Sequence, residues 1–191
     1  MGNKLLDKIE IPHDRFEVRL SGSGGQGMIL GAVILAEAIG YDYSKNVVQT
    51  QSYGPEARGG ASKADVVVST GEIYYPKALK LDLLLCMTQE SMDKYYQDLR
   101  EDGTLIIDDT LVTEVPTDDY YGLPFTRLAK EQAGHPMVAN VVALGAIAAL
   151  TEVVSQEDLT KAVLARAPRG TGDKNKRAVQ IGWDEALKIK K

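Results

Sequence analysis

The feature that most constrains the fold is a glycine-rich turn between an apolar strand and an apolar helix. Residues 16–20 (FEVRL) alternate apolar and polar side chains, which is the pattern of a β-strand. The turn at residues 22–27 (GSGGQG) leads into residues 28–39, which predict a closely packed helix ending at Gly40. A second strand is expected at residues 47–51. Such a strand–helix–strand unit implies two parallel strands joined by a right-handed crossover.

The rest of the chain continues to alternate strands with helices. Further strands are expected at residues 64–69, 81–87, 104–108 and, as a short element, 123–126. Further helices are expected at residues 88–101, 125–133, 137–150, 156–165 and 175–190. Thr88 would be the N-cap of the first of these helices, and its solvent-facing side would carry Ser91, Asp93, Tyr95 and Tyr96.

This order of elements predicts an α/β protein. We expect a three-layer α/β/α sandwich with a mostly parallel central sheet and a Rossmann-like first βαβ unit. Neither an internal repeat nor a low-complexity linker divides the sequence. An N-terminal arm of residues 1–15 would precede a single domain of residues 16–191.

Composition excludes several classes of protein. Hydrophobic residues make up 44% of the 191 residues, as in an ordinary soluble globular protein. The net charge of −5 argues against nucleic-acid binding. Cys86, His13 and His135 are too few to hold a disulfide, an Fe–S cluster or a histidine-rich metal site on this chain alone. The longest apolar run, residues 137–150, is shorter than the about 20 residues that a membrane span needs. With no signal peptide visible, we expect a cytoplasmic protein without a membrane partner.

The glycine turn could hold an anion. Gly22, Gly24 and Gly27 match the pattern G-x-G-x-x-G, in which glycines and a helix N-terminus bring backbone N–H groups close to a phosphate. However, residues 47–51 (VVQTQ) lack the carboxylate that would bind the ribose of a dinucleotide, and the turn lacks the Lys-Ser/Thr pair of a P-loop. Contact with a ligand or partner, a purely structural turn and an NAD(P) site all remain open.

A second candidate segment, residues 52–60 (SYGPEARGG), follows the strand at residues 47–51. It should therefore lie at the same carboxyl edge of the sheet as the glycine turn, where open α/β sheets bind ligands. Glu56 and Arg58 would point the same way in an extended segment, beside the ring of Tyr53. Arg58 could bind a carboxylate or a phosphate. The alternative is a surface loop braced by a Glu56–Arg58 ion pair.

Catalytic groups are not evident elsewhere in the sequence. Cys86 lies in an apolar strand and is expected to be an inert core thiol. His135, between Gly134 and Pro136, suggests a turn. Asp108 and Asp109 end a strand at the functional edge, but two acids there also fit a turn or the start of a helix. The sequence therefore looks like part of an active site, but it lacks evident catalytic groups.

Together these segments resemble a known family. Residues 24–27 (GGQG), residues 52–60, a helix that opens at Asn140 and the pattern Asn175-x-x-Ala178-x-x-x-Gly182 are similar to the gamma subunit of 2-oxoacid:ferredoxin oxidoreductases. The resemblance covers residues 16–183, and the second segment is most similar to the 2-oxoglutarate type.

The resemblance implies CoA-dependent oxidative decarboxylation of a 2-oxoacid to acyl-CoA and CO2, with electrons passed to ferredoxin. Alpha, beta and delta subunits would be the partners, and the isolated chain could form a homodimer. Thiamine diphosphate and the Fe–S clusters would belong mainly to the partners, and CoA would bind in the complex. The alternatives are a freestanding NAD(P)-binding oxidoreductase and a non-catalytic α/β ligand-binding module.

The candidate site consists of cofactor-binding or partner-facing residues, with no catalytic residue and no metal assigned. Arg58 is the residue expected to meet an anionic group on CoA, thiamine diphosphate or a partner carboxylate. The candidate residues are Gly24, Gly25, Gln26, Gly27, Ser52, Tyr53, Gly54, Glu56, Arg58, Gly59, Gly60 and Asn140.

Overall fold

A computed structural model describes residues 15–51 and 60–190, which form a six-stranded sheet in the order β2-β3-β1-β4-β5-β6. The neighbouring pairs β1–β4, β4–β5 and β5–β6 are parallel, and β3 is antiparallel to both of its neighbours. The expectation of a mostly parallel sheet is therefore confirmed. The strands are β1 (Arg15–Ser23), β2 (Asn46–Gln51), β3 (Ala61–Ser69), β4 (Leu81–Cys86), β5 (Leu99–Asp108) and β6 (Tyr121–Leu123).

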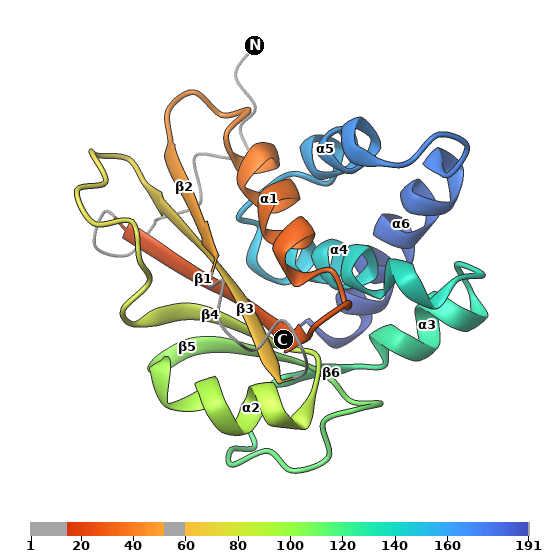
Figure 1. Ribbon diagram of the computed structural model, residues 1–191, viewed down its shortest axis with the longest axis horizontal. Coiled ribbons are helices and arrows are strands. Elements are labelled where there is room, and N and C mark those ends of the chain that lie inside the picture. The colour runs from red at the N-terminus through yellow and green to blue at the C-terminus, as the bar shows by residue number, and fades with distance from the viewer. Residues whose placement is uncertain (1–14, 52–59, 191) are drawn as a thin grey trace.

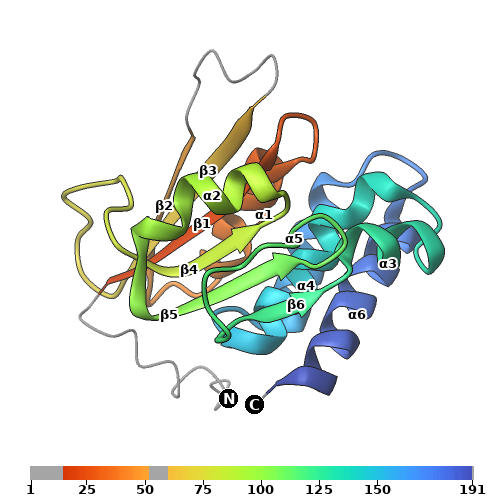
Figure 2. The same cartoon turned by 90° about the horizontal axis from the view of Figure 1, so that it is seen from below.

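Helices cover both faces of this sheet, in layers of unequal thickness. The short helix α2 packs on one face, and the other α-helices form a thick layer on the opposite face (Figures 1 and 2). The α/β/α sandwich is thus as predicted. The helices are α1 (Met28–Ile39), α2 (Gln89–Tyr95), α3 (Phe125–Glu131), α4 (Ala139–Thr151), α5 (Gln156–Arg166) and α6 (Gly172–Ile189), with 3-10 helices η4 (Tyr96–Asp98) and η5 (Pro136–Val138).

The first βαβ unit carries an inserted strand. β1 and β2 are both antiparallel to β3, so they run parallel to each other, as the sequence predicted. However, β3 lies between them in the sheet. Helix α1 has the predicted bounds, and the N–H of its C-cap, Gly40, donates to the carbonyl of Ala36. Because successive side chains of β1 point to opposite faces of the sheet, Val18 and Leu20 lie in the core under the thick layer. Arg19 lies on the face covered by α2.

The predicted helix at residues 88–101 was too long. Thr88 is the N-cap, as expected, but α2 ends at Tyr95, and residues 99–101 belong to β5. Ser91 and Tyr95 are buried rather than exposed, because this side of α2 packs on the sheet. The Ser91 hydroxyl forms a capping box with Thr88, and the Tyr95 hydroxyl donates to the carbonyl of Ala61 at 3.1 Å.

Two further sequence predictions concern the chain as a whole. The predicted arm, residues 1–15, lies outside the described residues except for Arg15, the first residue of β1, so the division into an arm and one domain stays a prediction. Among the helices that the structure describes, none combines the length and the apolar character needed to cross a bilayer.

Candidate functional site

The predicted site lies at the carboxyl edge of the sheet, where β1 and β4 end side by side. From β1 the chain passes through the glycine turn into α1 in the thick layer, whereas from β4 it passes into α2 on the opposite face. Helices that leave neighbouring parallel strands toward opposite faces open a crevice, and ligands of open α/β sheets bind at such a switch point. The topology therefore places the glycine turn at a position suited to binding.

The turn is held in shape by the side chain of Gln26. The side-chain Oε1 of Gln26 accepts a hydrogen bond from the backbone N–H of Ser23 at 2.8 Å. The backbone N–H of Gln26 also donates to the carbonyl of Ser23 at 3.3 Å. This closure needs a glycine at position 22, because a Cβ there would lie 2.4 Å from Gln26 Oε1 and 3.0 Å from Met87 Cβ. Gln26 is thus a positioning residue for the loop.

Gly24 and Gly25 form the exposed tip of the loop. A Cβ at either position would meet no described atom within 4 Å, and Gly25 has a φ of +90°, which favours glycine. The loop ends at Gly27, the N-cap of α1, with φ 76° and no side-chain cap among the described residues. Open glycine backbone beside a helix N-terminus is suited to an anionic group.

Asn140 reaches this loop from the first turn of α4. Its Nδ2 donates to the carbonyl of Gly27 at 3.1 Å, across 113 residues of sequence, and its Oδ1 accepts from the N–H of Val141 at 2.9 Å. A Cβ at Gly27 would lie 2.5 Å from Nδ2, so the contact requires this glycine. The structure thus brings Asn140 together with the glycine turn, as a buried support of its backbone.

Gly60 lies at the same edge, immediately before β3. It has a φ of +117°, and the following residue, Ala61, pairs with Ser23 at the end of β1. Glu90 of α2 accepts a hydrogen bond from the N–H of Ala61 at 3.2 Å. Glu90 could not be recognised from the sequence, because an acid in the first turn of a helix is common and by itself indicates no site.

The remaining candidates lie outside the described residues. These are Ser52, Tyr53, Gly54, Glu56, Arg58 and Gly59. The residues that flank this segment, Gln51 at the end of β2 and Gly60 before β3, are at the carboxyl edge. The roles assigned to Arg58 and to a Glu56–Arg58 pair stay predictions.

Cys86 is a buried thiol at the end of β4. It has no exposed surface, and desolvation raises the pKa of its thiol to about 12. The Ser21 hydroxyl lies 3.6 Å from its sulfur and donates to the carbonyl of Leu85 at 2.7 Å. This environment keeps the thiol protonated, so the prediction of an inert core cysteine agrees with the structure.

His135 and Asp108 serve turns, as the sequence suggested. His135 Nδ1 accepts from the N–H of Met137 at 3.2 Å and caps η5. The buried carboxylate of Asp108 accepts from the N–H groups of Thr110 and Thr126, both at 3.0 Å. Desolvation is the largest cause of the raised pKa of Asp109, and repulsion from the Asp108 carboxylate is the second.

Within residues 15–51 and 60–190, no group of three or more His, Cys, Asp or Glu side chains could hold a metal ion.

Comparisons with known proteins agree with this architecture. Residues 17–185 match the family described as Pyruvate ferredoxin/flavodoxin oxidoreductase. The chain is 48% identical over 179 residues to 2-oxoglutarate synthase subunit KorC of Methanocaldococcus jannaschii, covering 92% of this chain and 96% of the relative. It is 28% identical over 177 residues to pyruvate synthase subunit PorC of Methanothermobacter marburgensis, covering 88% and 96%.

A solved structure supports the same relationship. The gamma subunit of a keto/oxoacid ferredoxin oxidoreductase from Geobacter sulfurreducens is 47% identical, with a TM-score of 0.85 over 93% of this chain and 99% of that subunit. A 2-oxoglutarate:ferredoxin oxidoreductase from Magnetococcus marinus shares the fold at 18% identity, with a TM-score of 0.79 over 92% of this chain and 32% of that one. The chain belongs to the pyruvate ferredoxin/flavodoxin oxidoreductase family.

Proposed function

We propose that this chain is the gamma subunit of a 2-oxoacid:ferredoxin oxidoreductase complex that acts on 2-oxoglutarate. The complex would convert the 2-oxoacid and CoA to acyl-CoA and CO2 and pass the electrons to ferredoxin. The observation that carries the proposal is the 48% identity to a 2-oxoglutarate synthase subunit over almost the full length of both chains. Lower identity to a pyruvate synthase subunit, 28%, favours 2-oxoglutarate over pyruvate.

The chain would contribute binding surface rather than redox chemistry. Its single cysteine is buried and protonated, so an Fe–S cluster would have to be held by partner subunits. Thiamine diphosphate, when bound by a partner, supplies the electron sink for decarboxylation. The tip at Gly24 and Gly25 fits an anionic group, because its backbone is open and adjoins the N-terminus of α1. We assign to this tip, with Arg58, an anionic group of CoA, thiamine diphosphate or a partner.

The first experiment is a mild affinity purification of the tagged chain from its native cells. The eluate is assayed for CoA-dependent dye reduction with 2-oxoglutarate, pyruvate and branched 2-oxoacids. We expect co-purified subunits that contain thiamine diphosphate and Fe–S clusters, and the highest activity with 2-oxoglutarate. Purification of the chain alone, without activity, would contradict the proposal, and titration with NADH would then test the dinucleotide alternative.

A substitution at the glycine tip tests the role of this edge. Gly24→Val adds a side chain where no described atom lies within 4 Å, so the free energy of unfolding should change by less than about 0.5 kcal/mol. In the purified complex, the same side chain should obstruct the approach of the ligand or partner and lower the CoA-dependent rate at least tenfold. Gly71→Val, in an exposed turn at the opposite end of β3, is the matched control and should leave the rate unchanged.

A further inference from the structure

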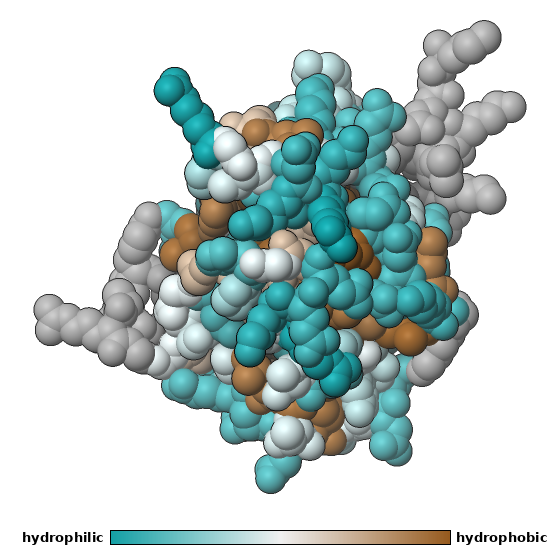
Figure 3. All heavy atoms as spheres, turned by 90° about the vertical axis from the view of Figure 1, so that its right-hand side faces the viewer, coloured by the Kyte–Doolittle hydropathy of each residue, from teal (hydrophilic) through white to brown (hydrophobic). Residues whose placement is uncertain are grey.

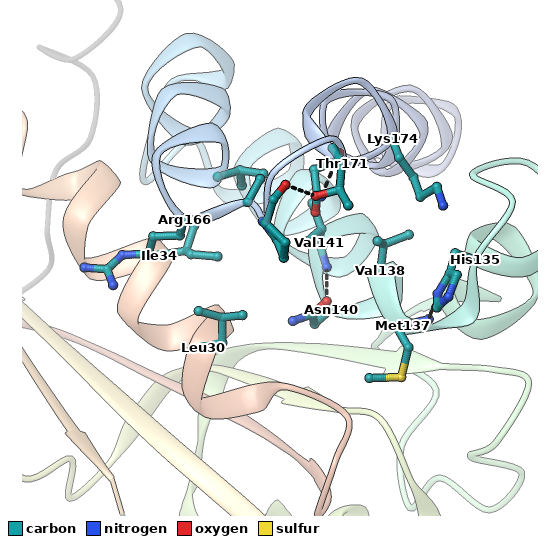
Figure 4. A pocket seen from close by; sticks show the side chains of 14 residues that line it. Leu30, Ile34, His135, Met137, Val138, Asn140, Val141, Arg166, Thr171 and Lys174 are labelled. Carbon is teal, nitrogen blue, oxygen red and sulfur yellow. Dashed lines mark hydrogen bonds between the residues drawn. The ribbon is translucent and has the colours of Figure 1, made fainter.

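A cavity of about 290 Å³ lies beside the candidate site, and Asn140, which donates to the Gly27 carbonyl of the glycine turn, forms part of its wall. It opens between α1, η5, the start of α4 and the segment that joins α5 to α6 (Figure 4). Most of its wall is apolar. The apolar side chains of the wall include Leu30, Ile34, Met137, Val138, Val141 and Val163.

The mouth of this cavity exposes large apolar side chains to solvent. Leu30 of α1 is 46% exposed and Met137 of η5 is 65% exposed, and both line the cavity. Figure 4 shows these two side chains on different walls, from α1 and η5 respectively. An apolar cavity with apolar side chains at its mouth can receive a large apolar side chain from another molecule.

Positive charge lies along one side of the same opening, on the segment that joins α5 to α6 and on the start of α6. Residues 166–177 (RAPRGTGDKNKR) carry five Lys or Arg residues and a single acid, Asp173, although the whole chain has a net charge of −5. Arg166 and Lys174 line the cavity, and Arg166 pairs with Glu37. In the part of the chain that the structure describes, no carboxylate forms an ion pair with Arg169, Lys174, Lys176 or Arg177. Hydrophilic side chains predominate on the side of the molecule that bears α3 and α6, with apolar patches between them (Figure 3).

We propose that this surface is the docking site for an acidic segment of a partner protein. One large apolar side chain of that segment enters the cavity, and flanking carboxylates meet Lys174 and Arg169. An apolar centre with a charged rim is the usual anatomy of a protein interface, and the charges steer the partner and fix its orientation. A nucleic-acid backbone carries no apolar side chain that would fill the cavity. The inference rests on the proposed function only in placing the chain within a complex.

Cross-linking in the assembled complex tests the proposal directly. The tagged chain, with a photoreactive benzoylphenylalanine in place of Met137, is expressed in its native cells, purified with its partners and irradiated. We expect a cross-link to a segment of another subunit in which Asp or Glu residues flank a large apolar residue. Purification without a cross-link, or a cross-link to a second copy of this chain, to nucleic acid or to a segment without acidic residues, overturns the proposal.

Two sets of substitutions separate the apolar centre from the charged rim. Leu30→Glu with Met137→Glu, and Arg169→Glu with Lys174→Glu, change side chains that reach solvent, so the fold should survive. We expect each double variant to reduce the co-purified partner at least tenfold, and retention at the wild-type level overturns the proposal. The control for the apolar centre is Leu79→Glu, because the side chain of Leu79 is also exposed, at 63%. The control for the charged rim is Lys77→Glu with Lys80→Glu. They lie on the loop before β4, at the opposite edge of the sheet, and should change retention by less than twofold.

The same purified complex distinguishes this inference from the proposed function. A complex that reduces dye with a 2-oxoacid but gives no cross-link from position 137 overturns the docking surface alone. A complex that gives the expected cross-link but oxidises none of the 2-oxoacids overturns the proposed function alone.

Discussion

Cys86 shows how burial sets the chemistry of a single residue. Its thiol has a pKa of about 12, against an ordinary value of 9.0, because desolvation disfavours the thiolate. We therefore expect iodoacetamide to leave the native chain unmodified at neutral pH and to alkylate Cys86 once guanidinium chloride unfolds the protein. Mass spectrometry of the two samples measures this difference. Alkylation of the native chain as fast as of the unfolded chain would contradict the assignment of Cys86 as an inert thiol.

The same shift makes stability depend on alkaline pH. Between pH 9.0 and about 12 the unfolded chain loses the Cys86 proton while the folded chain keeps it. The free energy of unfolding should then fall as pH rises through this window, by up to about 1.4 kcal/mol per pH unit from this group. Cys86→Ala removes this contribution and is the control. Equal slopes for the two proteins in urea titrations across that range would show that Cys86 is not the cause.

Asn140 is a buried polar residue whose side chain supports the backbone of the glycine turn. Asn140→Ala removes the bond from Nδ2 to the Gly27 carbonyl, which still accepts from the N–H of Gly31 at 2.8 Å. We expect the free energy of unfolding to fall by about 1–2 kcal/mol, as for a buried hydrogen bond. Asn46→Ala, which removes an exposed bond to the carbonyl of Gly71, is the matched control and should cost less than about 0.5 kcal/mol. If urea denaturation gave the same loss in the free energy of unfolding for Asn140→Ala and Asn46→Ala, the side chain of Asn140 would not stabilise the glycine turn.

At the scale of elements, the contact between α4 and α6 depends on two glycines that bring the helix backbones together. A Cβ at Gly182 would lie 1.8 Å from the carbonyl oxygen of Val142, and one at Gly145 would lie 2.3 Å from that of Val179. Backbone atoms cannot yield as a flexible side chain can, so any side chain at these positions must separate the helices. The buried helix α4 therefore has a fixed distance from α6.

Gly182→Ala should consequently destabilise the protein, although alanine is the better helix former. We expect a loss of about 3 kcal/mol or more in the free energy of unfolding, measured by urea denaturation. Gly31→Ala in α1 is the matched control, because its Cβ would make an ordinary contact at 3.4 Å with Leu20. That variant should be neutral or more stable by about 0.5–1 kcal/mol. A Gly182→Ala variant as stable as Gly31→Ala would refute the close approach.

Several element boundaries were predictable because local signals agreed with the tertiary structure. Helix α1 is bounded by Gly27 and Gly40 around an apolar segment, so its sequence alone indicates both ends. The end of α2 was not predictable, since residues 96–101 are compatible with a helix. Pairing of Leu99 with Leu81 in the sheet overrides that local preference.

Pairings between distant segments were harder to predict. The apolar pattern of β3 indicates a strand but not its direction, and its insertion between β1 and β2 depends on both neighbours. In the site, the glycine turn was recognisable from its own residues. Asn140 was a candidate through the family resemblance, and its bond to Gly27 spans 113 residues. The hydrogen bond from Ala61 to Glu90 likewise joins residues whose local sequence carries no shared signal.

At the scale of the whole molecule, the two faces of the sheet are stabilised differently. The thick layer covers a large apolar core, whereas the face beneath α2 combines a smaller apolar cluster with buried charges. There the guanidinium of Arg19, 2% exposed, binds Asp65 of β3 through two bonds of 2.7 and 2.9 Å. It also pairs with Asp98 of η4 and lies 5.2 Å from the centre of the Tyr95 ring. Arg19 of β1 thus connects the neighbouring strand β3 with the thin helical layer of α2 and η4.

Removal of Arg19 alone should cost much more than removal of the buried pair. Arg19→Met leaves the Asp65 carboxylate buried without its partner, and we expect a loss of about 3–5 kcal/mol in the free energy of unfolding, measured by urea denaturation at neutral pH. The double variant Arg19→Met with Asp65→Leu replaces both charges by apolar groups and should recover at least half of that loss. Arg166→Met, which breaks the more exposed pair with Glu37, is the control and should cost less than about 1 kcal/mol. A double variant no more stable than Arg19→Met would mean that Arg19 acts through its contacts with Asp98 and Tyr95 rather than by compensating the charge of Asp65.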